Sequence, residues 1–302
     1  MKKKEYIEEI IKLKKDRNAI ILAHNYQRGE VQDIADYIGD SLGLSQKAAE
    51  VKEKVIVFCG VHFMAETASI LAPDKIILIP DITAGCPMAD MINAQEMTDW
   101  RNKYSGKPVV CYVNSTAEVK AECDFCCTSS NAIKIVENID SNEILFAPDQ
   151  YLGSYVASKT NKKLILWDGY CYVHRMILPK HILDKKQKYP EAEVWAHPEC
   201  KGEVLELADK VLSTGGMVKQ ARLTDKKEII IATETGIIYR LKKENPDKNF
   251  YPAYEYAICS NMKKITLKKV LDSLREMKFK VKVPEEISVR AKKAIERMVS
   301  IA

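Results

Sequence analysis

The sequence has no long apolar run, no large net charge and no apolar segment at its start. Its longest apolar stretches, such as Ala19 to Ala23, are far shorter than the roughly 20 residues that a helix needs to cross a bilayer. Residues Met1 to Glu5 carry charge but lack the apolar region of a signal peptide. The net charge of +5 is mild, acidic residues lie beside the basic ones, and no basic patch is interleaved with aromatic residues. We therefore expect a cytoplasmic protein that binds neither a membrane nor nucleic acid.

Cysteine, by contrast, is abundant. Nine cysteines are an awkward odd number for a secreted chain, whereas in a cytosolic chain they indicate reduced thiols, a metal or a cluster. The length of 302 residues, 46% of them hydrophobic, leaves room for two or three domains with a large buried core.

Three copies of one pattern divide the chain. Each copy has an apolar strand, then a Glu-Val pair, then an aspartate six residues after the glutamate, and it ends at a cysteine behind another apolar run. The aspartates are 88 and 85 residues apart and the terminal cysteines 85 and 88, a period of domain size rather than that of a solenoid. The members are Glu30/Asp36, Glu118/Asp124 and Glu203/Asp209, with Cys86, Cys171 and Cys259 at the ends.

Each copy alternates strands and helices, which predicts a small parallel sheet covered by helices. We predict an α/β protein of three α/β/α sandwich domains, related by a pseudo-threefold axis around a central metal site. The predicted units are residues 1–86, 87–171 and 172–259. Residues 260–302 are predicted to form a helical tail that packs on the first unit and closes the ring.

If the three repeat-end loops converge on the axis, Cys86, Cys171 and Cys259 form one site. Loops after parallel strands are where α/β sheets bind ligands. Three thiolates suit either zinc with one open position or a cubane iron–sulfur cluster in which one iron has no protein ligand and can act as a Lewis acid. The other six cysteines have no cysteine at the matching places of the other copies. We interpret the Cys-x-x-Cys spacing of Cys123 and Cys126 as buried or incidental, with a redox or regulatory disulfide as the alternative.

Polar residues follow the first strand of each copy. Each alone could be a hydrogen-bonded core residue, but three equivalent clusters favour a shared site in which imidazole, carboxylate and phenol transfer protons. They are His24, Asn25 and Tyr26 in the first copy, Tyr112 and Asn114 in the second, and His197 and Glu199 in the third. His174, three residues after Cys171, is a further candidate to reach the substrate.

A hydroxyl residue lies five positions after each repeat aspartate, at Ser41, Ser129 and Thr214, and Ser213 is a neighbour of the last. Each could be a simple helix N-cap. Three converging helix starts would instead bind carboxylates or phosphates. We therefore expect a substrate with several negative groups.

Motifs along nearly the whole chain resemble the quinolinate synthase family, and they occur in the order typical of that family. The matching segments are Ala23-His24-Asn25-Tyr26-Gln27, Gly39-Asp40-Ser41, Phe63-Met64-Ala65-Glu66, Cys86-Pro87-Met88-Ala89, Tyr112-Val113-Asn114-Ser115-Thr116, His197-Pro198-Glu199-Cys200, Ser213-Thr214-Gly215 and Asn261-Met262-Lys263-Lys264.

The resemblance implies an enzyme of de novo NAD synthesis. Such enzymes condense iminosuccinate with dihydroxyacetone phosphate to give quinolinate, with loss of phosphate and two waters. It further implies three similar α/β/α domains around an oxygen-sensitive [4Fe–4S] cluster, with one open iron and three ligands that map to Cys86, Cys171 and Cys259. An L-aspartate oxidase or dehydrogenase would supply the imine.

The resemblance also suggests a role for each candidate residue. Tyr26, Tyr112, His197 and Glu199 would be catalytic, with Glu199 as the general base. The substrate-binding set would be His24, Ser41, Tyr112, Asn114, Ser129, His174, His197, Glu199, Ser213 and Thr214. Two rival interpretations remain, namely a zinc hydrolase with a three-cysteine site and an iron–sulfur redox sensor without enzymatic activity.

Overall fold

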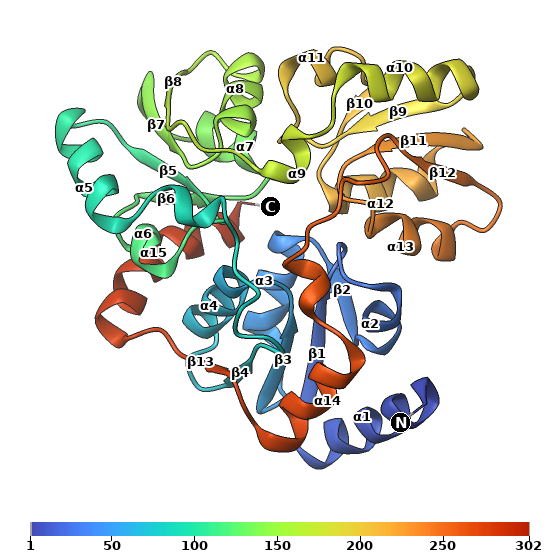
Figure 1. Cartoon of the computed structure of the whole chain (residues 1–302). Coiled ribbons are helices and arrows are strands. Elements are labelled where there is room, and N and C mark those ends of the chain that lie inside the picture. Colours follow the sequence, from blue (N-terminus) through green and yellow to red (C-terminus); the bar gives the residue numbers. More distant parts are fainter. Residues whose placement is uncertain (1, 302) are drawn as a thin grey trace.

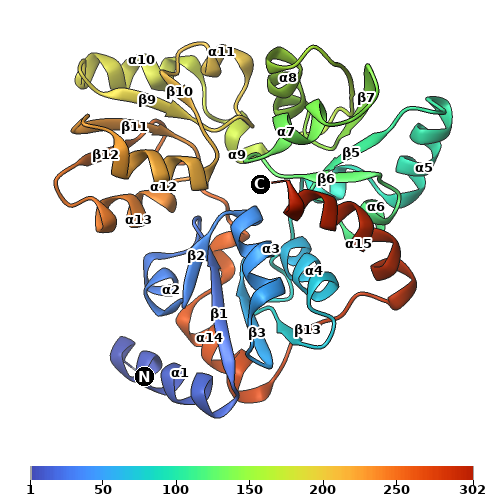
Figure 2. The same ribbon diagram turned by 180° about the vertical axis from the view of Figure 1, so that it is seen from behind.

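The computed structural model describes residues 2–301 and contains three separate sheets, each flanked by helices (Figure 1). Figure 1 shows three lobes around a common centre, and the view from behind in Figure 2 shows the same arrangement. Within each unit every strand pair is parallel. The α/β class predicted from the alternation of strands and helices is therefore confirmed. Across residues 2–301, no helix has both the length and the apolar character needed to cross a membrane.

The first unit is built on strands whose side chains are almost all buried. Its strands are β1 (Ala19–His24), β2 (Tyr37–Gly39), β3 (Val55–Cys59) and β4 (Ile76–Leu78). Its helices are α1 (Lys3–Asp16), α2 (Gly29–Ile34), α3 (Ser41–Glu50) and α4 (His62–Leu71). Strands β1 and β3 are buried at every position, as expected for a parallel sheet covered on both faces.

The second and third units repeat this order. The second has β5 (Val109–Tyr112), β6 (Phe125–Cys127), β7 (Glu143–Ala147) and β8 (Lys163–Leu166), with η1 (Ala89–Met91), α5 (Ala94–Lys103), α6 (Ala117–Ala121), α7 (Ala132–Glu137) and α8 (Gln150–Lys159). The third has β9 (Glu193–Ala196), β10 (Lys210–Val211), β11 (Glu228–Ala232) and β12 (Asn249–Pro252), with α9 (Tyr172–Arg175), α10 (Pro179–Lys188), α11 (Gly202–Leu205), α12 (Thr214–Leu223) and α13 (Ile237–Glu244).

The three sheets share one topology. The spatial orders β2-β1-β3-β4, β6-β5-β7-β8 and β10-β9-β11-β12 are the same order written three times. In each sheet the strand order reverses between the first and third strands, which lie side by side, and a crevice forms at the carboxyl ends of the strands at such a point. The second strand of each unit was not predicted from the sequence, because β2, β6 and β10 contain only three, three and two residues.

The repeat aspartates explain how each short strand is attached. Asp36 accepts a hydrogen bond from the backbone N–H of Ile21 at 2.8 Å. Asp124 does the same for Val109 at 2.8 Å, and Asp209 for Val194 at 2.7 Å. Each aspartate also donates its own backbone N–H to the carbonyl of the same residue, so two bonds join the start of the short strand to the first strand. The repeated Asp is thus a structural residue that fixes register.

The tail connects two units. Helix α14 (Leu267–Glu276) follows η2 (Met262–Lys264) and packs on α1 and β3. Strand β13 (Lys280–Val281) then adds antiparallel to β4. Helix α15 (Glu285–Ser300) packs chiefly on α6 and β6 of the second unit, as the red helix in Figure 2 shows. The tail therefore lies on the first unit through α14 and β13 and on the second through α15, while the unit boundaries given above stay a prediction.

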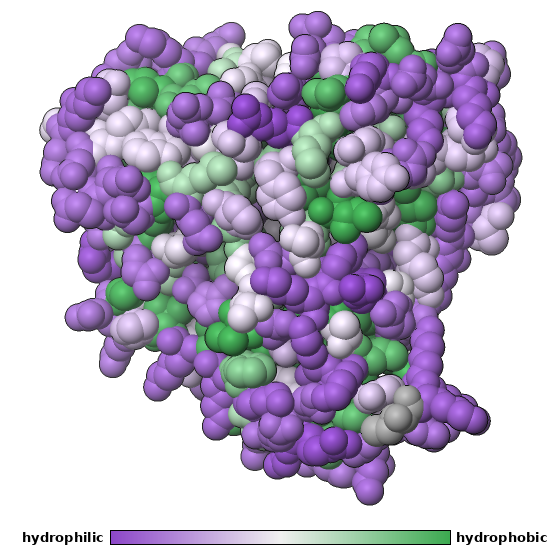
Figure 3. All heavy atoms as spheres, in the orientation of Figure 1, coloured by the Kyte–Doolittle hydropathy of each residue, from purple (hydrophilic) through white to green (hydrophobic). Residues whose placement is uncertain are grey.

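Figure 3 shows one face of the molecule, which is largely hydrophilic. Apolar side chains appear there as separate small patches and not as one broad area. Scattered exposed apolar residues of this kind are usual on a folded protein.

Candidate active site

A pocket lies where loops from all three units meet. It encloses about 760 Å³ of space that no atom fills, the solvent at its mouth included. Every candidate residue from the sequence lines it except Asn25 and Ser213. The lining candidates are His24, Tyr26, Ser41, Cys86, Tyr112, Asn114, Ser129, Cys171, His174, His197, Glu199, Thr214 and Cys259.

The aspartate that fixes each first strand also sets which residues reach this pocket. Counting from Ile21, Val109 and Val194, the third residue onward is His24, Tyr112 or His197, and the fifth is Tyr26, Asn114 or Glu199. All six line the pocket. Equivalent backbone positions therefore bring different chemical groups to one place.

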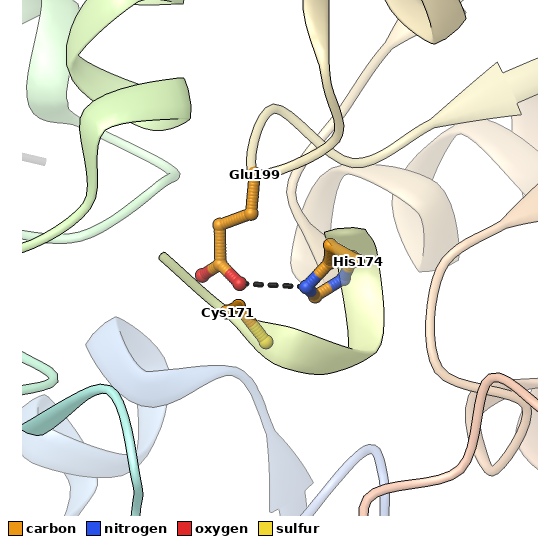
Figure 4. Close-up of side chains that lie close together, drawn as sticks. All are labelled: Cys171, His174 and Glu199. Carbon is orange, nitrogen blue, oxygen red and sulfur yellow. Dashed lines mark ion pairs between the residues drawn. The ribbon is translucent and has the colours of Figure 1, made fainter. Parts of the chain in front are cut away.

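Glu199 is the centre of the polar network. Its side chain is almost fully buried, and Tyr112 of the second unit donates its hydroxyl hydrogen to Oε1. The second oxygen, Oε2, lies 2.7 Å from Nδ1 of His174 (Figure 4). Figure 4 shows Glu199 reaching from its loop toward α9, which carries His174. This carboxylate thus joins groups from different units.

The ionisation of Glu199 reflects two opposing effects. Burial alone favours the neutral acid, but attraction to the imidazoles and the hydrogen bonds from His174 and Tyr112 outweigh it. They lower the pKa of Glu199 from 4.5 to about 2. Glu199 is therefore an anion at neutral pH, as a proton acceptor must be.

The network continues from His174 to Tyr26. Nε2 of His174 lies 2.7 Å from Oγ1 of Thr233, and the Tyr26 hydroxyl lies 2.5 Å from the same oxygen. Burial, followed by repulsion from Glu199, raises the pKa of Tyr26 well above 10. The pKa of Tyr112 is raised in the same direction by the same two causes, so both phenols keep their protons at neutral pH.

Two further histidines are held neutral. Burial lowers the pKa of His24 from 6.5 to about 4 and that of His197 to about 3. The His197 ring stacks on the His174 ring with centroids 4.6 Å apart, and its Nε2 lies 3.2 Å from the Ser129 hydroxyl. A neutral imidazole both donates and accepts one hydrogen bond, which suits recognition of polar substrate atoms.

The predicted hydroxyls separate into two kinds. Ser41 and Thr214 are the first residues of α3 and α12, and their N-caps are Asp40 and Ser213. Ser213 accepts the N–H of Gly216 at 3.1 Å and bonds to Ser130 at 2.8 Å, so it is occupied as a cap and does not line the pocket. The hydroxyl residues Ser41 and Thr214 line the pocket at helix N-termini, the kind of position that favours anions.

The three repeat-end thiols share this pocket. Cys86, Cys171 and Cys259 are partly buried. Burial raises the pKa values of all three thiols, that of Cys86 to about 12. Repulsion between neighbouring thiolates raises two of these pKa values further, because Cys259 acts on Cys86 and Cys86 acts on Cys171. Thiols that resist ionisation in the free protein but lie close together are suited to be ionised by a bound cation.

The spacing of these thiols does not fit one small ion. Three sulfurs on one tetrahedral zinc, with Zn–S bonds of about 2.3 Å, would lie roughly 3.8 Å apart. Within residues 2–301, the one group of three potential ligands whose atoms lie within 4.8 Å of one another is Cys171, His174 and Glu199. That group contains the His174–Glu199 ion pair of Figure 4. At least one pair of the three thiol sulfurs therefore lies more than 4.8 Å apart.

The second group of cysteines does not line the pocket. Cys111 and Cys126 face each other in register on β5 and β6, and Cys123 lies just before β6. All three are buried and free. Hydrogen bonds from Cys123 and Cys126 lower the pKa of Cys111, beside the fully buried Lys120. The interpretation of the Cys-x-x-Cys pair as buried is confirmed.

Three buried polar residues close to this network were not among the residues predicted from the sequence. Asp149 directly follows Pro148 after β7, and Thr233 and Glu234 directly follow β11. All three are buried. Polar residues right after the third strand of each unit were the available signal, since the first and third strands border the same crevice.

Fold and site together define an α/β enzyme with a buried acid–base pocket beside three thiols. The chain matches the family model described as "Quinolinate synthetase A protein" over residues 8–300. It is 59% identical over 293 residues to the "Quinolinate synthase" of Dehalococcoides mccartyi (strain CBDB1), covering 97% of each chain. The protein of that name from Thermodesulfovibrio yellowstonii is 54% identical over 296 residues (98% of each chain), and the one from Methanosarcina barkeri 50% over 301 (100% of this chain, 99% of the other).

The chain therefore belongs to the quinolinate synthetase A family. The resemblance found in the motifs is confirmed.

Proposed function

We propose that the chain condenses iminosuccinate with dihydroxyacetone phosphate to form quinolinate, with release of phosphate and two waters, in de novo NAD biosynthesis. The main observation in support of this proposal is the buried Tyr112–Glu199–His174 network in a pocket shared by all three units. The relatives named quinolinate synthase support it. A cytoplasmic location, and an L-aspartate oxidase or dehydrogenase as source of the imine, belong to the same proposal.

Glu199 is the general base of this proposal. It is ionised, it accepts a hydrogen bond from Tyr112 and lies 2.7 Å from Nδ1 of His174, and it lies beside the neutral imidazole of His197. A positioned carboxylate of this kind removes a proton from carbon or from a hydroxyl group of the bound intermediate. Tyr26 and Tyr112, which keep their protons at neutral pH, are the matching acids.

The other pocket residues are proposed to bind and orient the substrate. The hydroxyls of Ser41 and Thr214, at the starts of α3 and α12, are proposed to hold carboxylate or phosphate oxygens. Thr214 is itself held, because the Asn25 side-chain amide donates to it at 3.1 Å and Arg240 in turn donates to Asn25 at 2.7 Å. A fixed donor is worth more than a mobile one, because it need not reorganise during the reaction.

Cys86, Cys171 and Cys259 are proposed to hold a [4Fe–4S] cluster. Three thiols spaced too widely for a single zinc fit this group better than they fit the zinc hydrolase alternative. When bound, the cluster supplies a Lewis-acidic iron without a protein ligand. No other part of the proposed chemistry is assigned to it.

The test is anaerobic purification and assay of matched variants. The unmodified protein should contain about four iron and four sulfide per chain and form quinolinate from the two substrates. Cys86→Ala should lose the cluster absorbance, whereas Cys126→Ala should keep it. Glu199→Gln should keep the spectrum and nearly stop turnover. A cluster that survives Cys86→Ala, or normal turnover in Glu199→Gln, would refute the respective assignment, and a protein with cluster but no quinolinate would favour the redox sensor.

A further inference from the structure

We propose that the Tyr172 hydroxyl is a positioning group that holds the loop of Cys259 against the loop of Cys171 and so keeps a bound cluster in place. This role rests on the proposed function, because it concerns the site of the three repeat-end thiols. Tyr172 directly follows Cys171, is the first residue of α9 and lines the pocket. It was not among the candidate residues predicted from the sequence.

The Tyr172 side chain bonds to the residue that follows Cys259. Its hydroxyl oxygen accepts the backbone N–H of Ser260 at 3.1 Å and lies 3.3 Å from the Ser260 hydroxyl. A phenol both accepts and donates hydrogen bonds, so one oxygen can serve both contacts. A single hydroxyl thus joins the residue after Cys171 to the residue after Cys259.

A second contact joins the loops of Cys86 and Cys171. Met91 ends the short helix η1 that follows Cys86, and its carbonyl accepts the indole N–H of Trp167 at 2.8 Å. The Met91 sulfur accepts the backbone N–H of Tyr170 at 3.3 Å. Trp167 and Tyr170 lie in the segment that leads directly to Cys171. These two loops are therefore fastened to each other without any use of their thiols.

A third contact closes a ring of hydrogen bonds between the three thiol loops. Lys264 ends η2, the short helix that follows Cys259, and its Nζ donates to the Thr83 carbonyl at 2.5 Å. Thr83 lies three residues before Cys86. Together with the Tyr172 contact, this bond connects each of the three loops to both of the others. The chain therefore sets the relative positions of its thiols before any cluster is bound.

The Cys259 loop is the part of this ring that is most open to solvent. Cys259 has an exposed residue on each side, Ile258 and Ser260, whereas neither of the other two repeat-end cysteines does. Glu234 holds the Cys259 N–H at 3.1 Å, and Tyr172 holds the next N–H along the chain. A segment with few buried contacts opens locally at low cost. Loss of the Tyr172 hydroxyl should therefore let this loop open more often without unfolding the chain.

Removal of one hydroxyl at each of two tyrosines tests this role. Tyr172→Phe removes the hydroxyl and keeps the aromatic side chain. Tyr239→Phe is the control, because the Tyr239 hydroxyl also joins distant parts of the chain by its 2.8 Å bond to Asp33, but neither of these residues lines the pocket. Each full-length protein is loaded with iron and sulfide anaerobically. The loss of cluster absorbance in air and the transfer of iron to a ferrous chelator without air are then timed.

All three proteins should start with about four iron per chain. One hydrogen bond contributes about 0.5–1.5 kcal/mol, so both rates should be about 2- to 12-fold higher in Tyr172→Phe than in the unmodified protein. Tyr239→Phe should lose its cluster at the unmodified rate. A Tyr172→Phe cluster that is lost no faster than the unmodified one would overturn the role, as would equal acceleration in Tyr239→Phe.

A second measurement does not depend on the cluster. In the cluster-free chain, the alkylation rate of each cysteine by iodoacetamide is read from the mass of its peptide. Cys259 should react about 2- to 12-fold faster in Tyr172→Phe, whereas Cys123, which does not line the pocket, should react at an unchanged rate. An unchanged Cys259 rate would overturn the role of Tyr172. An unmodified protein that takes up no iron would refute the proposed cluster instead, and the Cys259 rate would still decide whether Tyr172 holds the loop.

Discussion

A buried ion pair fastens the loop that carries Cys259, and its removal gives a sharp test of the structure. Glu234 is fully buried; its Oε1 accepts the Cys259 N–H at 3.1 Å and lies 2.8 Å from Nζ of Lys263. Its Oε2 accepts the Gly236 N–H at 2.7 Å. Lys263 also donates to the Tyr26 carbonyl, so one pair links the third unit, the tail and the first-strand loop of the first unit.

The cost of breaking this pair can be estimated from its burial. Removing one partner of a buried ion pair costs about 3–5 kcal/mol, since a charge is left without compensation. Lys263 keeps one acceptor and is 17% exposed, so Glu234→Ala should lie near the low end, at about 3 kcal/mol. With a slope of about 3 kcal/mol per molar urea, the unfolding midpoint should fall by about 1 M.

Urea unfolding at neutral pH under anaerobic conditions measures this shift. Adding Lys263→Met to Glu234→Ala should recover part of the loss, because no unpaired charge then remains. Asp247→Ala is the control, since the Lys227–Asp247 pair has exposed fractions of 64% and 59% and should not move the midpoint measurably. A Glu234→Ala midpoint equal to that of Asp247→Ala would refute the buried-pair reasoning.

Two further predictions concern the pH dependence of stability and the hydrogen bond made by a repeat aspartate. His24 and His197 have pKa values lowered by burial, so below pH 6.5 the unfolded chain binds protons that the folded chain does not. The free energy of unfolding should therefore fall as the pH drops from about 6.5 toward 4, and each histidine contributes on the order of 1.4 kcal/mol for every tenfold loss of its proton affinity on folding. A further loss should begin below pH 4.5, where the unfolded chain protonates Glu199 while the folded chain keeps it ionised down to about pH 2. A urea midpoint that stays constant from pH 7 to about 4.5 would contradict this. Asp209→Ala should lose about 1–3 kcal/mol by leaving the Val194 N–H unpaired, and Asp209→Asn less; equal midpoints for the two would show that the bond does not matter.

Repetition made much of this fold readable from the sequence. The spacing of Asp36, Asp124 and Asp209 located three equivalent units, and apolar runs located the long strands. The short strands were not predicted, because two or three residues carry no periodic signal. These strands depend instead on the aspartate hydrogen bonds to the neighbouring strand. Such tertiary dependence is invisible in local composition.

Contacts between units were equally hidden. The Tyr112 hydroxyl bonds to Glu199, 87 residues later, and the Tyr26 hydroxyl meets Thr233, 207 residues later. Sequence reasoning placed the first three of these residues in one site but could not say which pairs touch, since that depends on how the three sheets are oriented. The position of α15 on the second unit could not be predicted either, because it depends on distant contacts such as the hydrogen bonds that the Asn131 side chain donates to the Met298 and Ile301 carbonyls.

The repeat also separates structure from chemistry. Positions that fix the fold are the same in all copies, as the three aspartates show. Positions that face the pocket differ, and at the fifth residue beyond the aspartate bond they are a phenol in Tyr26, an amide in Asn114 and a carboxylate in Glu199. Asn114 cannot exchange a proton near neutral pH, and its buried Oδ1 has no hydrogen-bond partner among the described residues. At this fifth position the first and third units therefore carry groups that can exchange protons, while the second carries an amide oxygen that is free to accept a hydrogen bond from a bound molecule.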